Sequence, residues 1–316
     1  MAARLGTNGP NIARADGPNV RGMSTSIECP GLIVGVDGSA ASKAAVDWAA
    51  RDASMRSVPL TLVHVASGLA GTWPQTPPPI GFGEWQQQRG RRIIDEAVSI
   101  VEEATRATGP IRVKSEMYYS AVVPTLVDMS KEADMVVVGC RGQGAFAALL
   151  GSVSSGLIHH AHCPVAVIHH DDRSTPHRAQ APVLVGVDGS KVSELATAIA
   201  FDEASRRQAD LIALHAWSDA GVLDFPGLDW STMKVSEDEV LAERLAGWQE
   251  RYPDVTVRRD VVCDRPARQL IEHADAAQLV VVGSHGRGGF AGMLLGSVSA
   301  AVVQSTRTPV IVARQA

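Results

Sequence analysis

Two stretches of this chain are nearly the same: Leu32-Ile-Val-Gly-Val-Asp-Gly-Ser39 returns as Val183-Leu-Val-Gly-Val-Asp-Gly-Ser190. A second pair follows, Val137-Val-Gly-Cys-Arg-Gly142 and Val281-Val-Gly-Ser-His-Gly286, and each member is followed by the sequence Leu-Leu-Gly-Ser-Val-Ser. The chain is therefore an internal duplication. The duplicated parts are glycine turns at the ends of apolar strands, the place where parallel α/β folds bind phosphorylated ligands.

Each half alternates short β-branched runs with longer helical patterns. Runs such as Met135-Val-Val-Val138 are continuously apolar, as expected when both faces of a sheet are covered. The alternation predicts two tandem doubly wound, Rossmann-like α/β domains, each a five-stranded parallel sheet flanked by helices. The predicted strands are 32–36, 59–65, 111–117, 134–139, 164–169, 183–187, 210–216, 255–262, 278–283 and 309–313. The predicted helices are 42–57, 85–107, 121–132, 152–161, 193–207, 235–251, 266–277 and 297–306.

The polar stretches set the domain limits. Residues 1–30 are rich in Gly, Asn, Arg, Ser and Pro and lack the apolar core of a signal peptide, so we expect a disordered leader. Domain 1 then spans 31–170, a linker 171–181, and domain 2 182–316.

Composition excludes several classes of protein. The 316 residues are 45% hydrophobic with a net charge of −5, which indicates a globular protein without a nucleic-acid or anionic-membrane surface. No apolar run is long enough to span a membrane. The four cysteines are scattered, which favours reduced thiols and a cytoplasmic location.

Aspartates follow the first strand of each half. Asp37 and Asp188 lie at the carboxyl edge of the predicted sheet, where a carboxylate could hydrogen-bond a base or ribose. The alternative is an Asx-turn that only ends the strand. We expect Ser42 and Ser193 to be the helix N-caps that follow.

The later glycine loop has the features of an anion site. Glycines allow the backbone to approach a phosphate closely. Gly296, Ser297 and Val298 open a helix whose amino end favours an anion. The chain has no Gly-Lys pair, Gly-x-Ser-x-Gly elbow or His-Glu-x-x-His motif, and the glycines do not follow the first strand as in the dinucleotide fingerprint. Binding is therefore better supported than catalysis, and we assign no catalytic residue.

At these residues the chain resembles the tandem-domain, ATP-binding branch of the universal stress protein family. The family motif is Gly, two residues, Gly, nine residues, Gly, then Ser or Thr, and Gly283, Gly286, Gly296 and Ser297 match it in full. The resemblance implies ATP, with Mg²⁺, held in the second half by Gly186, Asp188, Ala216, Asp219, Gly283, Gly286, Arg287, Gly288, Gly289, Gly296, Ser297, Val298 and Ser299. The corresponding first-half set is Gly35, Asp37, Val65, Gly139, Gly142, Gly144, Gly151, Ser152 and Val153.

The first half departs from the motif. Eight residues, 143–150, separate Gly142 from Gly151, one fewer than the motif requires. Because backbone hydrogen bonds weaken quickly with misalignment, we expect weaker or different ATP binding there.

The resemblance also implies a pairing of the two halves through their last strands, association of two chains, an unidentified protein partner, and a regulatory role in stress or growth. Slow ATP hydrolysis or phosphotransfer, and a scaffold with a vestigial nucleotide site, are alternatives. Two further features have open interpretations. His159, His160, His162, Cys163, His169 and His170 form either a metal site or a polar helix end. The proline-rich stretch 67–84 and its counterpart 218–234 are either lids or plain surface loops.

Overall fold

The computed structural model describes residues 4–5, 31–66, 80–140, 150–169, 180–216, 230–286 and 295–314. The strands are β1 (Arg4–Leu5), β2 (Leu32–Gly35), β3 (Leu60–Ala66), β4 (Val113–Tyr119), β5 (Met135–Gly139), β6 (Val165–Ile168), β7 (Val183–Gly186), β8 (Leu211–Ala216), β9 (Val257–Val262), β10 (Leu279–Gly283) and β11 (Val310–Ala313). The helices are α1 (Ala40–Arg56), α2 (Phe82–Ala104), α3 (Val122–Met129), α4 (Ser152–His160), α5 (Lys191–Arg207), α6 (Trp230–Arg251), α7 (Pro266–Ala274) and α8 (Ser297–Ser305).

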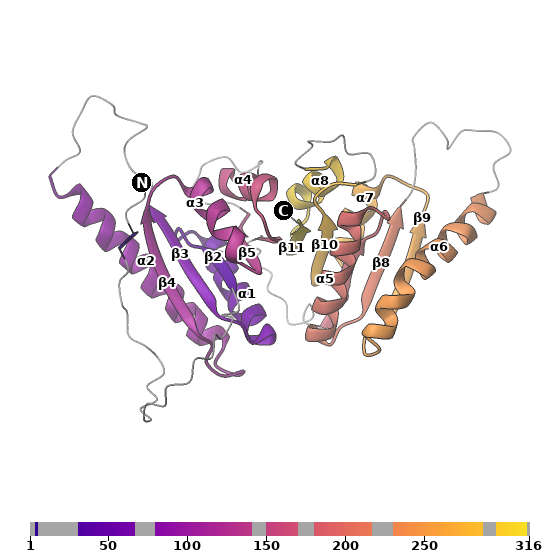
Figure 1. Ribbon diagram of the computed structural model, residues 1–316, viewed down its shortest axis with the longest axis horizontal. Helices are drawn as coiled ribbons and strands as arrows, with labels where there is room; N and C mark the ends of the chain where they lie inside the picture. The colour runs from indigo at the N-terminus through magenta and orange to yellow at the C-terminus, as the bar shows by residue number, and fades with distance from the viewer. Residues whose placement is uncertain are drawn as a thin grey trace, which may run out of the picture.

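Each half contains the predicted five parallel strands, and the two sets join into one sheet. The order is β1-β4-β3-β2-β5-β6-β11-β10-β7-β8-β9. At the centre β6 pairs antiparallel with β11, with Val167 opposite Val310 and Val165 opposite Val312. The last strands of the two halves therefore pair, as expected, and Figure 1 shows the resulting pseudo-twofold arrangement. Two separate sheets would have left two apolar edge strands without hydrogen-bond partners.

The helices cover both faces of this sheet. Helices α1, α2, α5 and α6 pack over one apolar cluster, and α3, α4, α7 and α8 pack over the other (Figure 1). Each cluster contains strand residues from both halves. Burial on both sides explains the continuously apolar strand sequences.

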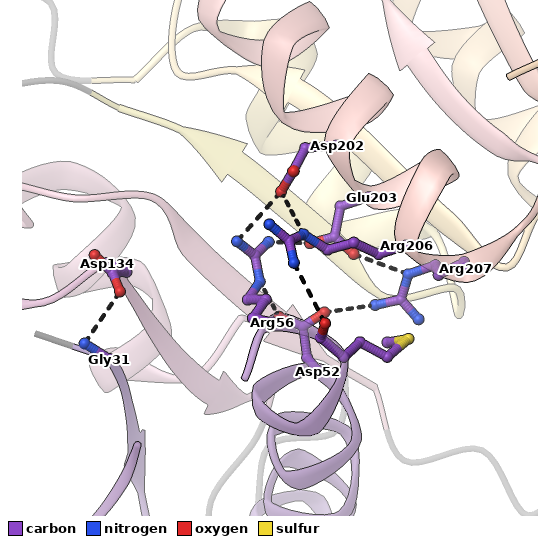
Figure 2. Close-up of polar contacts among 9 residues, drawn as sticks. Gly31, Asp52, Arg56, Asp134, Asp202, Glu203, Arg206 and Arg207 are labelled. Atoms are coloured by element: carbon purple, nitrogen blue, oxygen red, sulfur yellow. Dashed lines mark hydrogen bonds and ion pairs between the residues drawn. The ribbon is translucent and has the colours of Figure 1, made fainter. Parts of the chain in front are cut away.

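A network of buried charges joins α1 to α5 on one face of the junction (Figure 2). Asp52 and Glu203 are fully buried, and each accepts hydrogen bonds from both Arg56 and Arg207. Within a helix, Arg56 Nε lies 2.7 Å from Asp52 Oδ2 and Arg207 Nε lies 2.8 Å from Glu203 Oε2. Across the junction Arg207 reaches Asp52 Oδ1 at 2.9 Å, and Arg56 pairs with Glu203. None of these four residues lies in the repeated glycine motifs.

Several expectations change in detail or lie outside the described residues. Within the segment predicted as a disordered leader, Arg4 and Leu5 form a strand antiparallel to β4, and the rest of 1–30 lies outside the described residues. So do 67–79 and 217–229, which contain most of the two possible lids. Helix α6 begins at Trp230 instead of 235. Among the described residues, no helix is both long and apolar enough to cross a membrane.

Candidate functional site

The site in the second half lies where the order of the strands reverses. From β7 the chain continues to β8 on one side, and β10 pairs on the other side of β7. Their carboxyl ends meet at the same edge of the sheet, which is where doubly wound folds bind ligands. Gly186 ends β7 and Gly283 ends β10, so both lie at this switch point.

The aspartate after β7 forms an Asx-turn. Asp188 Oδ1 accepts a hydrogen bond from the Ser190 amide at 2.9 Å, and Asp37 does the same for Ser39 at 2.9 Å. Asp188 also lines a cavity, and its Oδ2 faces Gly286: a Cβ built on Gly286 would lie 2.4 Å from that oxygen. One carboxylate thus both ends the strand and faces the glycine loop. The Asx-turn and the ligand-binding interpretations of Asp188 are therefore compatible.

The helix that follows each aspartate is capped by a side chain. Ser190 is the N-cap of α5 and its side chain accepts from the Ser193 amide at 3.2 Å; Ser39 and Ser42 repeat this in α1. The prediction that Ser42 and Ser193 are the N-caps was wrong, because the caps lie three residues earlier. The N-caps Ser39 and Ser190 also donate their backbone amides to Asp37 and Asp188, so they hold the turns that carry these aspartates.

Within the described part of the chain, helices α4 and α8, which follow the glycine loops, begin without the side-chain cap that α1 and α5 have. Helix α8 starts after Gly296 and α4 after Gly151, and no side chain of the described residues caps either one. The first amides of α8, in Ser297, Val298 and Ser299, have no intrahelical partner, as at the start of any helix, and no side chain of the described residues caps them as Ser190 caps α5. All three residues line the cavity. Unpaired amides and the positive end of the helix dipole favour an anion at this position.

The hydroxyl of Ser299, in the first turn of α8, bonds backbone carbonyls of the protein itself. Ser299 Oγ donates to the carbonyl of Gly283 at 2.6 Å and lies 3.3 Å from that of Ser284. In the first half Ser154 Oγ donates to the Cys140 carbonyl, just after β5, at 3.1 Å, and it lies 3.0 Å from the carbonyl of Gly151, the N-cap of its own helix. These hydroxyls fasten the helix to the end of β5 or β10, so in this geometry the Ser299 backbone amide, and not its hydroxyl, is available to a ligand.

These elements enclose a cavity of about 330 Å³, within the size range of small-molecule sites. One wall is apolar, formed by Leu214, Ala216, Leu270 and Val282. The lining also includes Asp188 and the first residues of α8, Ser297, Val298 and Ser299. The cavity therefore combines an apolar lining with groups that favour an anion, which suits a ligand with an apolar part and an anionic part. Its lining residues are Gly186, Val187, Asp188, Ser193, Leu214, Ala216, Pro266, Leu270, Val282, Gly283, His285, Gly286, Gly296, Ser297, Val298 and Ser299.

Some of these residues were missed by sequence reasoning. Pro266 and Leu270 come from α7, which the repeated motifs do not include, and His285 was only a variable position of the glycine loop. A further missed residue is His215, buried beneath the site, whose Nδ1 donates to the Val187 carbonyl at 2.6 Å. His64 repeats this contact with Val36 at 2.8 Å. The signal was present, because a histidine recurs at the same place in both halves.

The first-half residues lie in corresponding places. Gly35 ends β2, Gly139 ends β5, Val65 lies in β3, and Gly151, Ser152 and Val153 begin α4. Gly139 is tightly packed, since a Cβ there would lie 2.7 Å from the backbone of Ala41. Several predicted site residues lie outside the described residues and their role stays a prediction: Gly142, Gly144, Asp219, Arg287, Gly288 and Gly289.

Two histidines of the predicted cluster, His159 and His169, hydrogen-bond backbone carbonyls. His159 Nδ1 lies 2.7 Å from the Ser155 carbonyl, and His169 Nε2 lies 3.0 Å from the carbonyl of Val303. Burial raises the pKa of the Cys163 thiol to about 12, which keeps it protonated at neutral pH. In the described part of the chain no three His, Cys, Asp or Glu residues are grouped to hold a metal ion. His170 lies outside that part.

Comparisons with known proteins agree with this architecture. The model of the universal stress protein family matches residues 32–169 and 181–314. The chain is 60% identical over 294 residues to universal stress protein Rv2623 of Mycobacterium tuberculosis, covering 93% of this chain and 99% of that protein. It is equally similar to Rv2005c of the same organism, covering 93% of this chain and 100% of that protein.

Among solved structures, a universal stress protein from Archaeoglobus fulgidus DSM 4304 has the same fold. The TM-score is 0.66 at 20% identity, over 92% of this chain and all of that one. The chain therefore belongs to the universal stress protein family and carries two of the family's domains in tandem.

Proposed function

We propose that this protein binds ATP, with Mg²⁺, in the cavity of its second half and acts as a nucleotide-dependent regulator of stress response or growth. The observation that carries the proposal is the amino end of α8, which has no side-chain cap among the described residues and lines the same partly apolar cavity as Asp188 at the switch point. Membership of the universal stress protein family supports the same ligand.

The proposed ligand orientation is the one that the family resemblance implies, and the lining of the cavity is compatible with it. The base lies against Leu214 and Leu270 and is hydrogen-bonded by Asp188 and the backbone at Ala216. The ribose lies at Gly283, where the sheet ends. The phosphates lie at Gly286 and the first turn of α8, where backbone amides and the helix dipole stabilise negative charge. Arg287, Gly288, Gly289 and Asp219 complete the proposed set.

Mg²⁺ fits this arrangement as a companion of the phosphates. Mg²⁺ in nucleotide sites keeps several waters and is bound through phosphate oxygens and one or two carboxylates, so it does not need a dedicated protein cage. Asp188 is the carboxylate that lines the cavity. When bound, the ion neutralises phosphate charge.

Occupancy differs between the halves in this proposal. The first-half loop is one residue shorter than the motif, and a backbone hydrogen bond weakens quickly when its donor is out of line with the acceptor. The first site therefore binds ATP more weakly. Association of two chains, a protein partner and a cytoplasmic location belong to the proposal through the family resemblance.

The test is to denature freshly purified protein and count the released nucleotide per chain by chromatography and mass spectrometry. Asp188→Ala and Asp37→Ala form a matched pair, because each loses the same 2.9 Å turn bond. We expect about one ATP per chain, lost in Asp188→Ala and retained in Asp37→Ala. Equal loss in both variants contradicts the asymmetry between the sites. No ATP, with no uptake of added ATP, contradicts the proposed function. ADP that accumulates steadily and stops with Asp188→Ala favours a hydrolytic enzyme instead.

A further inference from the structure

Helices α4 and α8 begin at the two proposed phosphate sites and end at the junction between the halves. Each has nine residues, or about 13 Å at 1.5 Å per residue. The last carbonyls of so short a helix have no intrahelical donors, so their partners lie elsewhere in the fold. In both helices that partner comes from the other half of the chain.

Arg314 provides the partner for α4. It directly follows β11 in the second half, yet its Nε donates to the Ala161 carbonyl at 2.9 Å and a second guanidinium nitrogen donates to the Ile158 carbonyl. The amide that would otherwise bond Ile158 belongs to His162, and it donates to Ser130 Oγ at 2.9 Å. The guanidinium thus holds the buried carboxyl end of α4, and its positive charge lies at the negative end of the helix dipole.

His169 provides the reciprocal contact. It directly follows β6 in the first half, and its Nε2 donates to the carbonyl of Val303 in α8 at 3.0 Å. Val303 is the counterpart of Ile158, just as His169 is the counterpart of Arg314 in the repeat. Because β6 and β11 are antiparallel neighbours, each strand delivers the residue that follows it beneath the helix of the other half.

The opposite end of each helix is fastened within its own half. Ser154 Oγ donates to the Cys140 carbonyl at 3.1 Å, and Ser299 Oγ to the Gly283 carbonyl at 2.6 Å. Each helix is therefore held at two points, about 13 Å apart or less. Without the contact at the carboxyl end, the serine hydrogen bond and the apolar packing still hold the helix, and we expect the helix to pivot about its serine. The first-turn amides then move away from the geometry that a phosphate needs.

We propose that Arg314 and His169 are positioning residues for nucleotide binding, each holding the phosphate-binding helix of the opposite half. The proposal rests on the proposed function, because it concerns the same two sites. It deepens that function by making each site dependent on a residue of the other half. Arg314 places a cation and two hydrogen bonds at the end of α4, so it has a larger effect than the single hydrogen bond from His169.

The experiment measures Mg²⁺-ATP and adenosine binding by calorimetry at one site at a time. Asp188→Ala isolates the first site and Asp37→Ala isolates the second. We expect Arg314→Met to weaken ATP binding at the first site by about fivefold, corresponding to about 1 kcal/mol, and to leave the second unchanged. His169→Phe should weaken the second site by about twofold, near the lower limit of the contribution of a single contact, and spare the first. Adenosine affinity should be unchanged in both variants, because adenosine lacks the phosphates.

Two control variants separate positioning from general damage. Arg307→Met removes the same charge from an exposed position after α8 and should change neither site. Arg314→Lys keeps the positive charge and should restore part of the ATP affinity. Equal weakening at both sites, or equal loss of ATP and adenosine binding, would overturn the positioning role.

Hydrogen exchange without nucleotide tests the contact independently of the ligand. We expect α4 amides to exchange about fivefold faster in Arg314→Met while α8 amides are unchanged, since about 1 kcal/mol of local stability is lost. If the parent protein binds no ATP, the proposed function fails while this result still stands for the helix contact. Unchanged exchange in α4 would show that Arg314 does not hold the helix.

Discussion

The buried charge network at the junction of α1 and α5 leads to a quantitative prediction. Replacing Arg207 with methionine keeps an unbranched side chain against Trp48, whose ring centroid lies 5.3 Å from the guanidinium carbon. It leaves Asp52 and Glu203, both fully buried, facing one arginine instead of two. Removing one partner from a buried ion-pair network costs about 3–5 kcal/mol, because the remaining charge loses its compensation.

We therefore expect Arg207→Met to lower the free energy of unfolding by about 3 kcal/mol and the melting temperature by roughly 6–12 °C. Thermal and urea unfolding followed by circular dichroism measure this. The control is Arg51→Met on α1, which breaks an i,i+4 pair with Asp47 whose arginine side chain is 60% exposed. Exposed pairs contribute about 0.5 kcal/mol, so that variant should melt within a degree or two of the parent.

A second substitution tests the reason for the loss. Asp52→Asn in the Arg207→Met background leaves Glu203 opposite Arg56, one negative and one positive charge, and should recover at least half of the lost stability. If Arg207→Met costs no more than Arg51→Met, the network contributes no more than a surface pair. If Asp52→Asn adds a further loss instead of a recovery, uncompensated charge is not the cause.

Three other outcomes follow from the same structure. Burial and the Glu203 carboxylate raise the pKa of Asp52 from 3.8 to about 6, so the folded protein holds this proton more tightly than the unfolded chain does. The free energy of unfolding, measured by urea titration, should therefore fall as the pH rises from about 4.5 through 6. This fall should be absent in Asp52→Asn. Gly286→Ala places a Cβ 2.4 Å from Asp188 Oδ2 and should weaken ATP binding about tenfold by calorimetry, whereas Gly247→Ala, whose Cβ meets nothing within 4 Å, should bind like the parent. Ser190→Ala removes the cap of α5 and should cost about 1 kcal/mol in urea unfolding; a loss below 0.3 kcal/mol would contradict a capping role.

Much of the site could be predicted from the sequence because its residues are adjacent to repeated strand ends. Asp188, Gly283 and Gly296 were assigned from the duplicated motifs, and all three line the cavity. Leu270 and Pro266 could not be assigned in this way, since α7 packs over the site only after the sheet forms. The N-caps of α1 and α5 were misplaced because serines three residues apart satisfy the same local pattern, and only hydrogen-bond geometry distinguishes the acceptor from the donor.

The sequence by itself determined the duplication, the parallel α/β order of each half and the glycine loops at the strand ends, because these depend on local periodicity and on conformations that glycine permits. Only the tertiary structure decided how the halves meet. The pairing of β6 with β11, the junction of Asp52 with Arg207, and the crossed contacts of Arg314 and His169 all join residues more than 130 positions apart. No short-range pattern encodes such contacts, because they arise when two apolar strand edges and two buried charge pairs find complementary partners.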